Sequence, residues 1–178
     1  MTDIISSKYI YEGHIINLRL EKINLGPGNK EKRLREVVEH NAAVAIVPID
    51  DHENILFVRQ YRHPTKEHLL EVPAGIIEKG EHPADTAMRE LQEEIGYKAG
   101  KMKFLAKIHP AIGFANEIMS VFLAENLEKT NHKRDKDEFL EIMPTELDKS
   151  LDLIWENKIT DVKTIIGLLW LQKIIDSL

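Results

Sequence analysis

The residues best placed to do chemistry are clustered carboxylates with few neighbouring cations, in the segment 75–97. There Arg89 is followed by three glutamates, Glu90, Glu93 and Glu94. On a helix Glu90 and Glu94 share one flank, and like charges at this spacing cost about 0.2–0.5 kcal/mol per pair. A hard divalent cation offsets that repulsion, since Mg²⁺ accepts one or two carboxylates, keeps several waters and bridges to phosphate oxygens. The alternative is an acidic surface helix without a ligand.

A short helix is predicted to position these carboxylates. Pro83 suits its first turn, and Gly96 suits the position just past its end. Its apolar residues recur at i, i+3, i+4, i+7 and i+11, which makes one stripe of the residues Ala84, Ala87, Met88, Leu91 and Ile95.

The order of residues in this segment matches the Nudix signature. That signature is a glycine, five residues, a glutamate, seven residues, Arg-Glu-aliphatic-any-Glu-Glu-any-Gly and an apolar residue. The matching residues are Gly75, Glu81, Arg89, Glu90, Leu91, Glu93, Glu94, Gly96 and Tyr97. The chain therefore resembles the Nudix family, which implies a hydrolase that uses Mg²⁺, with Mn²⁺ as the alternative ion, to cleave a diphosphate linked to another moiety.

Length and composition narrow the class of protein. A chain of 178 residues suits one domain with a real core. The net charge of −6 argues against nucleic acid as a partner, because phosphate backbones bind basic faces. The sequence has no cysteine, and no apolar run approaches the ~18 residues of a membrane-spanning helix. The N-terminus has no signal-peptide core. We expect a cytoplasmic protein that binds no membrane.

The N-terminal part, residues 1–39, is predicted to be a small antiparallel sheet of three strands, with a turn at Gly26–Asn29 before the third. Such a sheet is marginal alone and must pack on something. From the residues alone it is either an edge sheet of the main domain, residues 40–178, or a platform for dimerisation.

The main domain is predicted to alternate strands and helices, which favours an α/β (α+β) sandwich. Two polar segments interrupt it, a basic turn at 98–103 and a run without periodicity at 125–138. The predicted strands are 42–49, 55–60, 69–73, 104–108, 118–124 and 139–143, and the predicted later helices are 146–157 and 161–178. A Nudix fold, a mixed sheet between helices, is consistent with this order.

The resemblance extends over nearly the whole chain, and it is to the ADP-ribose pyrophosphatase branch of the family. The segments that carry it are REVVEHNAAVAIVPI, FVRQYRHP, LLEVPAGIIEKGE, PAIGFANEIMSVFLAENL, DKDEFLEI and KITDVKTIIGLLWL. It implies hydrolysis of ADP-ribose, or of a related nucleoside diphosphate sugar, by a metal-activated water. It also implies a domain-swapped homodimer built with the N-terminal sheet, in which both subunits line the site.

The resemblance also implies roles for individual residues. Glu90 and Glu94 are the principal metal ligands, Glu93 shares a second ion, the carbonyl of Ala74 is a further ligand, and Arg89 holds one of these carboxylates in place. Arg59 and Arg62 grip the diphosphate beside Glu71, and Glu117 lies near the terminal ribose.

The general base in this branch is a glutamate on the mobile loop before the last strand. By position this is Glu138, with Asp137 and Asp135 as alternatives. A base on such a loop is useful if closure of the loop excludes bulk water.

Two positions depart from the pattern of ADP-ribose hydrolases. Ile112 stands where they carry a proline before Gly-Phe, and Asn41 stands where proline often follows Glu-His. These departures leave GDP-mannose and other nucleoside diphosphate sugars open as substrates. A Nudix protein that senses nucleotides without catalysis is the alternative from another class, and the complete glutamate set argues against it.

Overall fold

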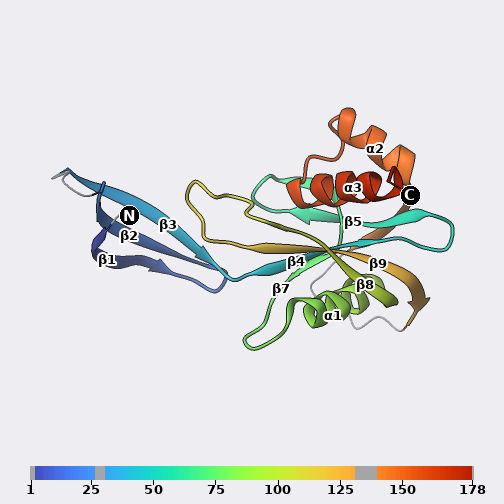
Figure 1. Cartoon of the computed structure of the whole chain (residues 1–178), viewed down its shortest axis with the longest axis horizontal. Coiled ribbons are helices and arrows are strands. Elements are labelled where there is room, and N and C mark those ends of the chain that lie inside the picture. The colour runs from blue at the N-terminus through green and yellow to red at the C-terminus, as the bar shows by residue number, and fades with distance from the viewer. Residues whose placement is uncertain (1–2, 27–30, 131–139, 178) are drawn as a thin grey trace. The chain divides into compact units, whose positions relative to one another are not determined.

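The computed structural model covers the full chain and describes residues 3–26, 31–130 and 140–177 (Figure 1). The chain divides into two compact units. One unit comprises Met1–Ala42 together with His109–Ile118, and the other comprises Ala43–Ile108 together with Met119–Leu178.

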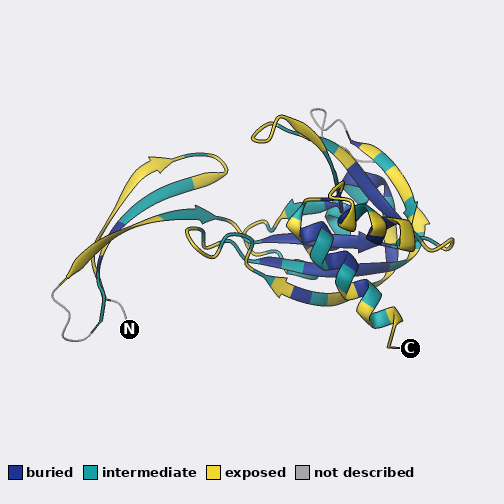
Figure 2. Cartoon of the chain, turned by 90° about the horizontal axis from the view of Figure 1, so that it is seen from above, coloured by how far each residue is buried: buried dark blue, intermediate teal, exposed yellow. Residues whose placement is uncertain are grey.

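The first unit contains a three-stranded antiparallel sheet, as predicted. Its strands are β1 (Asp3–Glu12), β2 (Ile16–Asn24) and β3 (Lys32–His40), in the order β1-β2-β3. Every residue of β1 is exposed, whereas Glu21 and Ile23 in β2 are buried. Figure 2 shows this difference in burial between the strands. The sheet thus has an uncovered strand with many apolar residues.

The loop between β8 and β9 docks on β3 in the same unit. The backbone N–H of Val38 donates to the carbonyl of Phe114 at 2.8 Å, and the N–H of Asn116 donates to the carbonyl of Val38 at 3.1 Å. The side-chain oxygen of Asn116 accepts a bond of 3.0 Å from the backbone of His40. The loop is therefore fixed to β3 in the manner of an added short strand.

The second unit contains two sheets and three helices. One sheet has the order β7-β4-β9-β8, in which β4 runs parallel to β9 and antiparallel to β7; the other has the order β10-β5-β6. The strands are β4 (Ala43–Pro48), β5 (Asn54–Arg62), β6 (Glu67–Glu71), β7 (Ala74–Ile76), β8 (Tyr97–Ile108), β9 (Met119–Lys129) and β10 (Glu141–Glu146). The helices are α1 (Pro83–Ile95), α2 (Leu147–Trp155) and α3 (Val162–Ile175).

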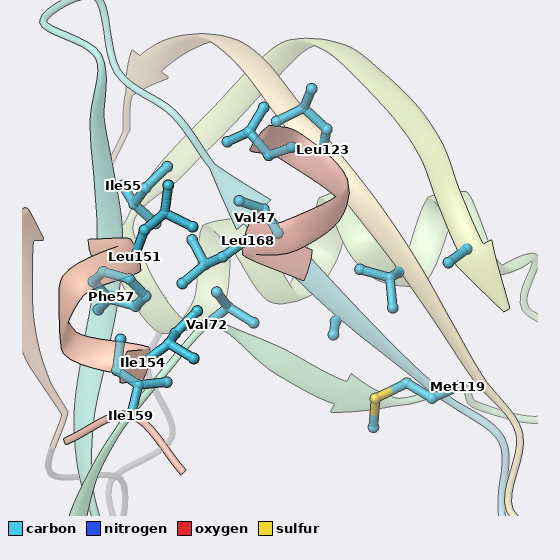
Figure 3. Packing of buried hydrophobic residues seen from close by; sticks show 14 of the residues in the cluster. Val47, Ile55, Phe57, Val72, Met119, Leu123, Leu151, Ile154, Ile159 and Leu168 are labelled. Carbon is cyan, nitrogen blue, oxygen red and sulfur yellow. The ribbon is translucent and has the colours of Figure 1, made fainter. Parts of the chain in front are cut away.

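Strand β4 is buried on both faces, which explains its continuous apolar sequence. Its alternate side chains belong to two separate apolar clusters. Val47 packs in the cluster that includes residues of α2 and α3, such as Leu151 and Leu168 (Figure 3). Val44 and Ile46 pack in the cluster that includes Leu91 of α1. A mixed sheet lies between helices on both faces (Figure 1), and this confirms the predicted fold class.

The three predicted helices are present, with α1 within its predicted bounds and Asp161 as the N-cap of α3. Asp161 accepts a hydrogen bond of 3.0 Å from the backbone N–H of Thr164. Among the described residues, none of the helices has both the length and the apolar character to cross a membrane.

Several segments differ from the prediction: the strand expected at 69–73 is β6, which ends at Glu71, and β7 was not predicted. The prediction of a basic turn at 98–103 is wrong, because β8 begins at Tyr97 and includes this segment. The lysines of the segment lie on an edge strand, where they discourage pairing with other chains. The prediction that residues 125–138 form no regular element is partly wrong, since 125–129 continue β9. The last strand begins at Glu141, whereas its predicted first residue, 139, lies outside the described residues. The strand tolerates Pro144 because it too lies at a sheet edge.

Candidate active site

Helix α1 begins and ends at local signals. The ring nitrogen Nδ1 of His82 accepts a hydrogen bond of 3.3 Å from the backbone of Ala84, and Pro83 follows in the first turn. Gly96 closes the helix in the left-handed conformation, with φ of 73°, which a glycine adopts without strain. The fully buried Leu91 fixes which side of the helix faces the core. The apolar stripe therefore determines which way the glutamate-bearing flank of the helix faces.

Arg89 ties the acidic residues of this segment together. Its Nη1 donates to Oε1 of Glu90 at 2.7 Å and to Oε2 of Glu93 at 2.8 Å. Its Nε and Nη2 donate to the two carboxylate oxygens of Glu81, both at 3.1 Å. Nη2 also donates to the carbonyl of Ile76 at 3.2 Å. Arg89 therefore fixes three carboxylates and the backbone of β7 at once.

The electrostatics of this cluster follow from the same contacts. Hydrogen bonding from Arg89 lowers the pKa of Glu81 to about 2. Hydrogen bonding to Glu81 in turn raises the pKa of Arg89, against the opposing effect of burial. Both groups are thus charged at any physiological pH.

Strand β7 brings backbone against the carboxylates of α1. A Cβ atom placed on Gly75 would lie 1.9 Å from Cδ of Glu90, so only glycine fits there. The backbone N–H of Ala74 donates to Oε2 of Glu94 at 3.2 Å, and Glu94 is buried. The side chains of Glu90 and Glu94 therefore lie directly beside the Ala74–Gly75 backbone.

These residues fit a hard divalent cation. No three or more His, Cys, Asp or Glu side chains converge as a metal cluster in the described part of the chain. Magnesium does not require such a cluster, because it uses one or two protein carboxylates and completes its shell with water and phosphate oxygens. Glu90 and Glu94, with the backbone of Ala74 beside them, supply a donor set of this kind.

A second charged cluster lies at the end of β6. Glu71 is 2% exposed and accepts two hydrogen bonds of 2.7 Å from Nε and Nη2 of Arg62. It also forms an ion pair with Lys163 of α3, whose Nζ lies 2.9 Å from Oδ2 of Asp161. Opposite charges are thus paired in a network that is buried at Glu71 and Lys163 and reaches the surface at Arg62.

Electrostatic effects connect this network to the acidic helix. Hydrogen bonds to Glu71 raise the pKa of Arg62 despite its burial, and the charges of Asp161 and Glu94 raise it further. Burial raises the pKa of Glu71, but the bonds and charges of Arg62 and Lys163 outweigh that effect and lower it. Arg62 therefore lies within the electrostatic reach of Glu94.

Sequence reasoning did not single out Lys163. Its position in the sequence could have identified it, because the helix dipole disfavours a lysine in the first turn unless an anion lies beside it. That anion, Glu71, is 92 residues away in sequence.

The remaining predicted site residues have other partners or lie outside the described part of the chain. Nη1 of Arg59 is 3.4 Å from Oε2 of Glu141, and both side chains are at least half exposed. Glu117 belongs to the first unit, where its Oε1 is 3.6 Å from Nδ1 of His40. The predicted base, Glu138, and its alternatives Asp137 and Asp135 lie outside the described residues.

The fold and the glutamate-bearing helix define the class of protein as a Nudix hydrolase. The model of the NUDIX domain matches residues 39–160, and the chain belongs to the NUDIX family. Hydrolases of this family generally need a divalent metal ion.

Similar proteins are known in sequence and in structure. The chain is 41% identical to an ADP-ribose pyrophosphatase of Bacillus subtilis (strain 168) and 38% identical to a methanol dehydrogenase activator of Bacillus methanolicus. In both cases the match covers 94% of this chain and 91% of the relative. A crystal structure of an ADP compounds hydrolase superposes with a TM-score of 0.89 at 24% identity, over 99% of this chain and 95% of that chain. This last likeness supports the fold.

Proposed function

We propose that this chain hydrolyses the diphosphate bond of ADP-ribose, giving AMP and ribose 5-phosphate, and that it uses Mg²⁺ for this reaction. The observation that carries the proposal is the pairing of Glu90 and Glu94 with the backbone of Ala74 and Gly75. The similarity to an ADP-ribose pyrophosphatase over nearly the full length of both chains supports the choice of substrate.

The acidic helix has the role of holding the metal. Glu90, Glu94 and the carbonyl of Ala74 are the ligands, and Glu93 shares a second ion. When bound, such an ion neutralises charge on phosphate oxygens and lowers the pKa of water. Arg89 orients Glu90 and Glu93, because one guanidinium nitrogen bonds both. The positions of two of the proposed ligands therefore depend on a single arginine.

The remaining residues bind substrate and move a proton. Arg62, held in one orientation by Glu71, binds the diphosphate, and Arg59 assists it. Glu117 binds near the terminal ribose. Glu138 takes the proton from the attacking water, with Asp137 and Asp135 as the alternative bases.

A homodimer formed through the N-terminal sheet completes the proposal. In support, β1 exposes large apolar side chains along its length, and a surface of this kind marks an interaction site. These side chains are between 44% and 60% exposed and belong to Ile4, Ile5, Tyr9, Ile10 and Tyr11.

Another nucleoside diphosphate sugar, such as GDP-mannose, is the second candidate substrate. The observation in its favour is Ile112, which is 81% exposed and replaces the proline typical of ADP-ribose hydrolases. A relative with 38% identity is a methanol dehydrogenase activator, so similarity of this degree does not by itself determine the substrate.

A substrate panel tests the proposal. The purified protein is given ADP-ribose, GDP-mannose, other nucleoside diphosphate sugars and dinucleoside polyphosphates, with Mg²⁺, with Mn²⁺ or with EDTA, and products are separated by chromatography. We expect AMP from ADP-ribose only when metal is present. Glu94→Gln should lose more activity than the roughly 10–100-fold typical for a residue that merely supports a ligand.

The matched control is Glu156→Gln, the same substitution at an exposed residue that caps the C-terminus of α2. It should keep full activity. Equal product release by wild type and Glu94→Gln would contradict catalysis through this site. Cleavage of GDP-mannose alone would contradict the choice of substrate but leave the reaction type intact.

A further inference from the structure

The first turn of α3 is joined to the end of β6 by two successive side chains. Nζ of Lys163 forms an ion pair with Oε2 of Glu71. Oγ1 of Thr164 accepts a hydrogen bond of 2.9 Å from the backbone N–H of Val72. Thr164 is itself held by Asp161, because its hydroxyl donates to Oδ2 at 2.6 Å. The start of α3 thus fixes both the side chain of Glu71 and the backbone that follows it.

Lys163 occupies an unfavourable place for a lysine. It is 7% exposed, and it lies in the first helical turn, where the helix dipole repels a cation. Burial of a cation also carries a desolvation penalty, which an apolar side chain of similar volume would avoid. The ion pairs with Glu71 and Asp161 offset this cost. The charge of Lys163 is therefore better explained by its effect on Glu71 than by packing.

Glu71 transmits that effect to Arg62. Its two oxygens accept one bond each from Nε and Nη2 of Arg62, so the guanidinium plane is fixed by the carboxylate plane. Glu71 is almost completely buried, whereas the Arg62 side chain is 42% exposed. Lys163 contacts the buried carboxylate of Glu71. The same carboxylate sets the orientation of Arg62, whose side chain reaches the surface. Among the described residues, Glu71 pairs with the two cations Arg62 and Lys163, so without Lys163 it would keep Arg62 alone.

We propose that Lys163 is a positioning residue for substrate binding: it holds Glu71 in the orientation that presents Arg62 to the substrate diphosphate. This inference rests on the proposed function, which assigns Arg62 to the diphosphate. Lys163 itself touches neither substrate nor metal, and it acts through Glu71.

The test compares Lys163→Met with Lys173→Met. The two substitutions are the same and lie on the same helix, but Lys173 is exposed in the last turn. Initial rates with ADP-ribose give kcat and KM separately. For Lys163→Met we expect KM to rise about ten-fold with kcat within about two-fold, the pattern of a lost binding contact. Lys173→Met should match the wild type in both constants.

The split between the two constants separates positioning from stability. Partial unfolding reduces the amount of active enzyme, which lowers apparent kcat and leaves KM unchanged. A fall in kcat and Tm with unchanged KM would therefore overturn the proposal. In an Arg62→Ala background, Lys163→Met should add no further rise in KM, because both changes act on one contact. Additive effects on KM would also overturn it.

A second variant covers the case in which Lys163→Met does not fold. Glu71→Gln/Lys163→Met removes the buried anion and its cation together, so no uncompensated anion remains. It should raise KM as Arg62→Ala does, because a neutral amide cannot hold the guanidinium by two ionic hydrogen bonds. Unchanged KM in this double variant would overturn the proposal.

A binding measurement separates this inference from the proposed function. Titration calorimetry with inorganic pyrophosphate measures diphosphate binding without hydrolysis. We expect about ten-fold weaker binding by Lys163→Met than by wild type or Lys173→Met. Wild-type protein that binds pyrophosphate but does not cleave ADP-ribose would refute the proposed substrate alone. Equal pyrophosphate affinity in wild type and Lys163→Met would refute the role of Lys163.

Discussion

The carboxylate of Glu90 occupies the space where a side chain on Gly75 would be. A Cβ atom on Gly75 would lie 1.9 Å from Cδ and 2.0 Å from Oε1 of Glu90, far inside contact distance. Strand β7 and helix α1 can approach this closely only because residue 75 has no side chain. The glycine of the Nudix signature is therefore a requirement of packing between a backbone and a proposed metal ligand.

Gly75→Ala should accordingly displace Glu90 and abolish most activity. We expect a loss of stability of about 1–3 kcal/mol, typical of overpacking, from urea unfolding. The control is the same substitution in a Glu90→Ala background, where the methyl group has room and should cost little stability. An equal stability loss in the two backgrounds would show that the contact with Glu90 is not responsible.

Glu81 should make the stability of the protein depend on pH on the acid side. Its pKa in the folded protein is about 2, against an ordinary value of 4.5, because of Arg89. The stabilising contribution is therefore complete above about pH 4.5 and is lost as the pH falls towards 2. Wild type should exceed Glu81→Gln in urea midpoint at pH 6, and the gap should close towards pH 2. The gap should be modest, since water screens this partly exposed pair.

Arg89→Gln provides the comparison for that experiment. Without the guanidinium, only the hydrogen bonds from Thr86 and from the backbone of Glu78 still lower the pKa of Glu81, so the midpoint shift caused by Glu81→Gln should depend much less on pH in that background. A gap between wild type and Glu81→Gln that stays constant from pH 6 to pH 3 would contradict the assigned pKa.

The proposed base can be identified by three matched substitutions. Glu138→Gln, Asp137→Asn and Asp135→Asn each remove one carboxylate from the same segment without changing its size. General-base catalysis contributes typically 10²–10⁴-fold, so one variant should lose about that much in kcat. Pyrophosphate binding should be retained in all three. We expect the loss in Glu138→Gln; a loss in one of the other two would assign the base to that residue instead.

The proposed homodimer depends on the exposed face of β1. Ile10→Glu places a charge at a position that is 54% exposed in the single chain. If β1 packs on a partner subunit, the variant should shift towards monomer in light scattering coupled to size-exclusion chromatography. Trp155→Glu, on α2 and 68% exposed, is the control and should keep the mass of the wild type. A monomeric wild-type protein would contradict the proposal.

Elements set by local signals were predictable. Helix α1 was expected to have Pro83 in its first turn and to end just before Gly96, and it spans Pro83–Ile95, because its apolar spacing and its terminal proline and glycine are local signals. Strand β4 was likewise evident from its apolar run. Strand β8 was not predicted in full, since only its pairing with β9 turns a lysine-rich segment into an edge strand.

The sequence by itself determined the acidic helix, the glycine beside it and the membership of the Nudix family, because these depend on residue type at fixed short spacing. The tertiary structure decided which charges meet. The bond from Arg89 to the carbonyl of Ile76 requires β7 and α1 to be packed together, and Glu81 joins it from the loop between these elements. The contact of Lys163 with Glu71 joins residues 92 apart, and only the packing of α3 against the sheet brings a buried cation to that carboxylate.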